Sequence, residues 1–418
     1  MASVEKMVER ARPFLRGELE SIDDKLPSMV GVLQSMGAGE CWHKHGSFLH
    51  HLLDIYRILY LWNAPPPVCL CGLFHSAYSN SYVNLAIFHP STGRHVLRSL
   101  VGPQAERFIH LFCVVPRHPL IHDHLLFHYS DSELLHHLSQ SHISLHNAKN
   151  GVFDPHQAWR KKLQGLVPAE GVRVKHIRTG ESVQVSRRIV AIFIMMTMAD
   201  FCDQLFGFQD SLFDNANGRL EFSGNNCGAL WPGDGKPGLW LNSISRMGAV
   251  YNLIAREEEI FIEEKKRSGS GSGSGSVSDI ERDEDIELVI PPVFDGCTKV
   301  LDAGDQIVAR DLYWEAVSKG SAGGVNVEEL LVGCIRKNPF VGEPYVVLSQ
   351  VYVTEGRFEE AEKHAEIGLM LLLQWGCPWD KRTSWEAWVA WTRLLLMKAK
   401  DKSWPNSSWG ILNLGLVN

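Results

Sequence analysis

The chain has 418 residues, of which 45% are apolar and 21% are charged. This composition is typical of a folded protein, and the length predicts two or three domains. The 41 Lys and Arg residues and 48 Asp and Glu residues give a net charge of -7, which argues against a basic nucleic-acid-binding protein. The nine cysteines include no CxxC pair, which indicates reduced thiols and a cytoplasmic protein.

The sequence also argues against membrane targeting. Residues Met1–Glu20 are charged and lack the apolar core of a signal peptide. The most apolar stretch, Ile189–Phe206, contains Asp200 and Asp203, which a lipid bilayer would penalise. We therefore expect no membrane-spanning helix and no membrane partner.

A charged, flexible segment over residues 264–290 predicts a boundary between an N-terminal part, residues 1–263, and a C-terminal part, residues 291–418. Within this segment, Ser268–Ser276 alternates Ser and Gly without exception. Such regularity is typical of an engineered linker, and it indicates that a native loop was replaced. A natural low-complexity linker is the alternative.

The spacing of apolar residues predicts that the N-terminal part is mostly helical. Alternating residues in Val172–Ile177 and Ser182–Val185 predict one small β-hairpin, and Asp210–Trp240 is expected to be a long loop. The helices expected in chain order are Val4–Leu19, Phe48–Trp62, Val68–Tyr82, Arg94–Phe112, part of Leu125–Leu145, Arg187–Leu205 and Ile244–Ile262.

Residues in the C-terminal part follow the spacing of two helices joined by a turn, with Gly356 at the turn and Ala361 where the helices meet. This pattern resembles the tetratricopeptide repeat, which implies a helical domain able to bind a protein partner. Trp385, Trp388 and Trp391 share one face of a later helix, either as packing residues or as a peptide-binding surface. The residues of the pattern are Tyr345, Leu348, Tyr352, Gly356, Phe358, Ala361 and Leu369.

Three residues of the N-terminal part have the chemistry of metal ligands. His51 lies on the inward, apolar face of its predicted helix, and His75 lies on the inward face of the next. Asp200 is flanked by apolar residues, and a buried carboxylate is costly unless it is paired or bound to a metal. Two imidazoles and one carboxylate from three helices match the composition of a 2-His-1-carboxylate metal site.

The same residues resemble the HD-domain superfamily of helical metal-dependent phosphohydrolases. Gly72–His75 is similar to the small-apolar-apolar-His run of that family, and Met198–Asp200 is similar to its apolar-Ala-Asp closing motif. The distance along the chain from His51 to His75 resembles that in the alarmone hydrolases. The resemblance covers Cys41–Leu205 and implies an HD-type helical bundle.

The resemblance implies that His51, His75 and Asp200 bind a divalent metal ion: manganese, iron or zinc. The family's Asp after the second His is Ser76 here, as in an uncharacterised HD-like family that carries His-Ser. We therefore expect a mononuclear site, with Ser76 near the reaction. Gln204 stands where the alarmone hydrolases have an Asn, and it is expected to hydrogen-bond a ligand.

Lys44 and His45, in the segment Cys41–His45 before the first inward His, predict a cationic edge over an anionic substrate. A solvated turn is the alternative. Ser79-Asn80 replaces the Glu-Asp pair that the alarmone hydrolases use, so alarmone hydrolysis is not expected.

The leading hypothesis is a metal-dependent HD-type hydrolase that acts on a small phosphorylated or otherwise anionic metabolite. One alternative is a catalytically degenerate HD domain that senses a ligand and binds a protein partner through the repeat region. Another is a non-haem Fe(II) oxygenase, because three facial ligands with open positions suit iron and oxygen. The identity of the metal that co-purifies would discriminate between the two enzyme hypotheses.

Overall fold

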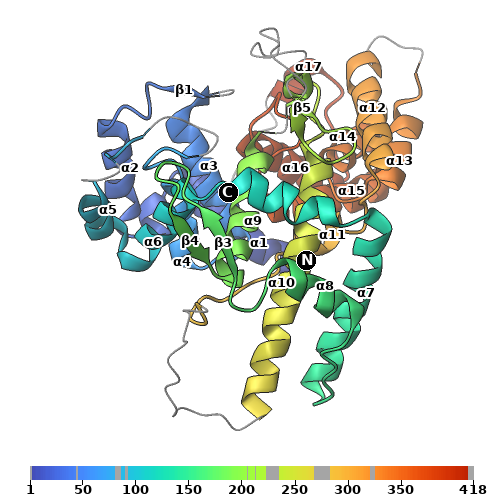
Figure 1. The fold of residues 1–418 in the computed structure, drawn as a ribbon. Coiled ribbons are helices and arrows are strands. Elements are labelled where there is room, and N and C mark those ends of the chain that lie inside the picture. The colour runs from blue at the N-terminus through green and yellow to red at the C-terminus, as the bar shows by residue number, and fades with distance from the viewer. Residues whose placement is uncertain are drawn as a thin grey trace. The chain divides into compact units, whose positions relative to one another are not determined.

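The computed structural model describes residues 2–43, 46–80, 86–89, 93–204, 206–211, 213–222, 235–267, 283–320 and 325–412 (Figure 1). Over these residues the chain is mostly helical, and its strands form two-stranded antiparallel sheets. The predicted mostly-α class with a small hairpin is confirmed. None of the helices in the described ranges combines the length and hydropathy needed to cross a lipid bilayer.

The chain forms two compact units, each assembled from separate stretches of sequence. Both units take residues from either side of the predicted linker at 264–290, and Ser268–Ser276 lies outside the described residues. The predicted domain boundaries stay a prediction. Unit 1 comprises Met1–Pro27, Phe201–Ser243 and Asp302–Asn418, and unit 2 comprises Ser28–Asp200 and Ile244–Leu301.

The first inward His lies on α3 (Phe48–Leu61), whose start and end have clear local causes. The Ser47 hydroxyl accepts a hydrogen bond from the backbone N–H of His50 and so caps the helix N-terminus. Beyond the helix, Asn63 has a positive φ of 60°, and a run of prolines follows. The predicted helix Phe48–Trp62 therefore agrees with the structure to within one residue.

The next helix, α4 (Pro66–Leu73), is shorter than predicted. Over the described residues up to Asn80, the predicted helix Val68–Tyr82 was wrong beyond Leu73, because Phe74 leaves the helical region with a φ of -117° and a ψ of 21°. Ser79 then takes a positive φ of 65°, which a continuing helix would not allow. His75 therefore lies in a turn rather than on a helix face.

The predicted helix Arg94–Phe112 is two helices, α5 (Arg94–Val101) and α6 (Pro103–Val114). Gly102 separates them with a φ of +85°, which glycine adopts readily. Pro103 then occupies the first position of α6, where its missing N–H costs no helical hydrogen bond.

Unit 2 also contains α9 (Arg187–Asp203) up to Asp200, packed against α10 (Trp240–Arg267). A Cβ added at Gly248 would lie 3.3 Å from Met198 Cε, so glycine lets the two helices approach closely. At the N-terminal end of α9, Arg187 and Arg188 donate hydrogen bonds to the buried Glu258 of α10. These contacts fix the helix that carries Asp200.

The predicted hairpin is β3 (Val172–Lys175) paired with β4 (Ser182–Val185), and Val172 lies opposite Val185. The other elements of unit 2 are β1 (Trp42–His43), β2 (Gly46–Ser47), η2 (Pro119–Asp123), η3 (Leu126–His128), α7 (Asp131–Lys149), α8 (Ala158–Leu166) and α11 (Pro292–Cys297). The helix α2 (Leu26–Ser35) begins in unit 1 and ends in unit 2.

In unit 1, α14 (Glu343–Thr354) and α15 (Phe358–Trp375) form a helical hairpin, drawn in red-brown in Figure 1. Gly356 makes the turn with a φ of +74°, and Ala361 is fully buried. The remaining elements are α1 (Ala2–Arg16), η1 (Leu19–Ser21), η4 (Gly207–Ser211), β5 (Phe213–Asp214), β6 (Glu221–Phe222), α12 (Ala303–Lys319), α13 (Val327–Lys337), α16 (Trp385–Lys400) and α17 (Ser408–Leu412).

The tryptophans of α16 pack within unit 1. Trp385 and Trp388 are buried, and each indole N–H donates to a backbone carbonyl, of Leu372 and Asp380 respectively. The Trp391 indole N–H donates to the side-chain oxygen of Gln350 on α14 at 3.1 Å. These contacts agree with the packing alternative for the tryptophan stripe.

Candidate metal site

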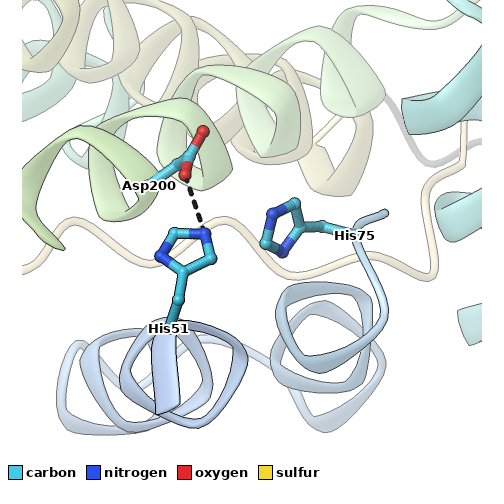
Figure 2. Close-up of side chains that lie close together, drawn as sticks. All are labelled: His51, His75 and Asp200. Atoms are coloured by element: carbon cyan, nitrogen blue, oxygen red, sulfur yellow. Dashed lines mark ion pairs between the residues drawn. The ribbon is translucent and has the colours of Figure 1, made fainter. Parts of the chain in front are cut away.

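His51 on α3, His75 in the turn after α4 and Asp200 on α9 point toward one another within unit 2 (Figure 2). One ligand atom from each residue lies within 4.8 Å of the other two. His51 Nε2 is 3.3 Å from Asp200 Oδ1, and the two imidazole rings are 5.2 Å apart between centroids. Among the residues that the structure describes, this is the one group of His, Cys, Asp and Glu with such an arrangement.

The face of α3 decides the orientation of His51. Ile55 and Ile58 of the same face are fully buried, and His51 is only 3% exposed. The preceding His50 is exposed, as its place on the polar face predicts. The apolar periodicity of the helix therefore directs one of two adjacent histidines into the interior.

A local hydrogen bond orients His75. Its Nδ1 lies 2.8 Å from the backbone carbonyl of Gly72, so Nδ1 carries the proton and donates to that oxygen. The lone pair is then on Nε2, the nitrogen that a metal ion would take. A Cβ at Gly72 would lie 2.5 Å from Leu59 Cδ1, so glycine lets α4 pack this closely on α3.

Burial and neighbouring charges set the protonation states of two of the three candidate ligands. Burial alone would raise the pKa of Asp200, but the hydrogen bond and charge of His51 hold that pKa well below its usual range. Burial lowers the pKa of His75 to about 4, although the charge of Asp200 opposes this shift. At neutral pH, Asp200 is therefore anionic and His75 is neutral.

A buried arginine adds positive charge near the site. The guanidinium of Arg117 lies 3.6 Å from the centre of the Phe112 ring, and Arg117 is 1% exposed. The Phe112 ring is in turn 6.2 Å from the His75 ring, at 90°. The charge of Arg117 contributes to the low pKa values of both Asp200 and His75.

The other predicted site residues stay predictions. Ser76 is fully buried, and its hydroxyl accepts a hydrogen bond of 2.8 Å from the side-chain amide of Asn80. Gln204 is buried and belongs to unit 1. Lys44 and His45 lie outside the described residues.

His43 is a neighbour of the site that the sequence did not single out from the segment Cys41–His45. It ends β1, and its ring centroid is 4.4 Å from that of His51. A strand of two residues has no alternating pattern, so the sequence carried no signal for this contact.

A family model described as a domain of unknown function (DUF6817) matches residues 32–117, about a fifth of the chain. The matched residues include His51 and His75 but not Asp200. No curated protein and no solved structure matches the chain. These comparisons name no reaction, and the likenesses to the HD-domain superfamily and to the tetratricopeptide repeat stay predictions.

Proposed function

We propose that unit 2 is a metal-dependent hydrolase in which His51, His75 and Asp200 bind one divalent cation. The substrate would be a small phosphorylated or otherwise anionic metabolite. The observation that carries this proposal is the convergence of three ligand atoms within 4.8 Å from three separate segments of the chain. Such a convergence requires the tertiary fold, because the three residues are far apart in the sequence.

The donor set fits manganese, iron or zinc, which accept imidazole nitrogen and carboxylate oxygen. When bound, such an ion lowers the pKa of a coordinated water and polarises a phosphoryl oxygen. The chain supplies the orientation: the Gly72 carbonyl fixes the ring of His75, and Asp200 faces His51 at 3.3 Å. Three protein ligands leave coordination positions for water and substrate.

The residue after His75 supports one metal ion rather than two. Ser76 is neutral, and its hydroxyl already accepts a hydrogen bond from Asn80. A bridging ligand between two cations is usually a carboxylate, which brings negative charge and two oxygens. We therefore propose a mononuclear site.

The test is phosphate release from p-nitrophenyl phosphate and a panel of phosphomonoesters by protein loaded with Mn²⁺, Fe²⁺ or Zn²⁺. The proposal predicts metal-dependent turnover that His75→Ala and Asp200→Asn abolish. The matched control His50→Ala changes an exposed histidine of the same helix and should keep the activity. Metal-loaded wild-type protein that releases no phosphate from any ester would contradict the proposal.

A second candidate is a partner-binding role for unit 1, with unit 2 as a ligand sensor. The hairpin of α14 and α15, with its turn at Gly356 and close contact at Ala361, favours this reading, because tetratricopeptide repeats bind peptides. In this case His75→Ala would leave partner binding unchanged.

Iron that co-purifies with the protein, together with oxygen consumption, would instead favour the non-haem Fe(II) oxygenase. We place the protein in the cytoplasm because of its cysteine pattern.

A further inference from the structure

His43 is held at a fixed position relative to the helix that carries His51. It lies opposite Gly46 in the β1–β2 hairpin, which directly precedes α3. The backbone N–H of Phe48 donates to the carbonyl of Cys41 at 2.8 Å. The hairpin is therefore tied to the first turn of α3, and His43 keeps its place beside His51.

The ring of His43 packs directly on the ring of a candidate ligand. Its centroid is 4.4 Å from that of His51, with an angle of 47° between the planes, and 5.4 Å from that of Phe48. His43 is partly exposed, whereas His51 is 3% exposed. The ring of His43 thus packs on a buried candidate ligand, and its Nε2 is itself buried.

His43 is not a member of the group whose ligand atoms lie within 4.8 Å of one another. We propose that His43 contacts the anionic substrate, by donating a hydrogen bond from its ring N–H to an oxygen of that anion. This inference rests on the proposed function of the His51, His75 and Asp200 site. The contact needs no change of protonation, because a neutral imidazole still carries one N–H.

The distances allow this contact. Metal–nitrogen and metal–oxygen bonds are about 2.0–2.2 Å long, so an anion oxygen bound beside His51 would lie about 3 Å from the ligating nitrogen. The centroid of the His43 ring is 4.4 Å from that of His51, so the His43 ring would be a near neighbour of such an oxygen.

The charge of the site favours an anion at this position. Asp200 is the one carboxylate of the candidate ligand group, so a bound divalent cation would leave a net positive charge. The nearby guanidinium of Arg117 adds to it, since its charge acts on both Asp200 and His75. A hydrogen bond to a charged oxygen is stronger than one between neutral groups, so His43 would affect affinity measurably.

The test measures inorganic phosphate binding by isothermal titration calorimetry, with protein loaded with Mn²⁺ and its manganese content determined first. His43→Phe keeps a flat ring against His51 but removes the N–H donor, and His43→Gln keeps a donor. His50→Phe is the control, because His50 is exposed and precedes His51. Should His43→Phe not fold, His43→Asn replaces it, because Asn is too short to reach the same oxygen.

We expect His43→Phe to bind phosphate about tenfold or more weakly with unchanged manganese content, the effect of losing a hydrogen bond to a charged group. We expect His43→Gln and His50→Phe to stay close to wild type. Unchanged phosphate affinity in His43→Phe would overturn the inference, as would manganese-loaded wild type that binds no phosphate. Loss of manganese in His43→Phe would overturn it too, by assigning His43 to the metal. Wild-type protein that takes up no manganese would instead contradict the proposed function, the metal-dependent hydrolase.

Discussion

His51 Nε2 lies 3.3 Å from Asp200 Oδ1, although α3 and α9 are separated by more than a hundred residues of sequence. The contact is largely buried, since the side chains of the two residues are 3% and 13% exposed. A buried carboxylate is costly without a partner, so this pair accounts for the charge of Asp200 within the fold. The pair also brings two candidate ligand atoms, His51 Nε2 and Asp200 Oδ1, close to each other.

Asp200→Asn tests whether the carboxylate binds a metal ion. The variant keeps the shape of the side chain but removes its charge. We expect Mn²⁺ at about 100 times its Kd to raise the wild-type free energy of unfolding by about 2.7 kcal/mol and to leave that of the variant unchanged. Urea denaturation with and without Mn²⁺ measures this. Asp123→Asn, an exposed acid of unit 2, is the control, and equal protection of both variants would contradict the account.

Gly72→Ala tests how α4 positions His75. The added Cβ would lie 2.5 Å from Leu59 Cδ1 and 3.1 Å from Ile55 Cγ2, so either these side chains must repack or the helices must separate. We expect a loss of about 1–3 kcal/mol in the free energy of unfolding, and weaker metal binding. Gly31→Ala, in α2 with no neighbour within 4 Å, should be neutral or stabilising by up to about 1 kcal/mol. Equal effects of the two substitutions on metal affinity would show that the close packing at Gly72 is irrelevant to the site.

Ser76→Ala separates a structural role of the hydroxyl from a role in metal binding. Asn80 loses the acceptor of its 2.8 Å hydrogen bond, which should cost about 1–2 kcal/mol. We expect the metal content to stay the same, because the structure pairs Ser76 with Asn80. Metal that disappears from this variant would instead make Ser76 a ligand.

Glu343 in unit 1 should make stability depend on pH. Burial raises its pKa to about 7, and the charge of Asp380 adds to the shift. The folded state therefore binds more protons than the unfolded state from the ordinary glutamate pKa up to about 7, so the free energy of unfolding falls as pH rises through this window. The expected change is roughly 3 kcal/mol at most.

Glu343→Gln should flatten this pH dependence, because a glutamine side chain does not titrate. Its amide oxygen can still accept the hydrogen bonds from the backbone N–H groups of Trp379 and Asp380. Denaturation between pH 4.5 and pH 7 measures the slope. Glu328→Gln is the control: Arg357 and Tyr352 lower the pKa of Glu328, which places its titration below this window. A variant that keeps the full wild-type slope would rule out Glu343 as its origin.

The sequence predicted the helices whose signals are local. The apolar face of α3 directs His51 inward, and the cap at Ser47 and the prolines that follow delimit the helix; all of these lie within one stretch of sequence. The hairpin of β3 and β4 has a clear alternation and agreed with the structure. The α14–α15 turn at Gly356 was visible for the same reason.

Features that depend on single backbone angles or on distant packing were missed. The predicted second helix ends early because Phe74 has a φ of -117°, and Gly102 divides the third. Unit 1 includes the N-terminal segment because α1 packs against α15, and no local sequence pattern encodes this contact. The contact of His43 with His51 depends in the same way on a hairpin with two-residue strands.

The most direct test of the central claim is elemental analysis of the purified wild-type protein beside a His75→Ala, Asp200→Ala double variant, both after incubation with divalent metal and desalting. The account predicts about one manganese, iron or zinc ion per wild-type chain and none in the folded double variant. A folded wild-type protein that retains no metal, or a double variant that retains as much as wild type, would contradict it.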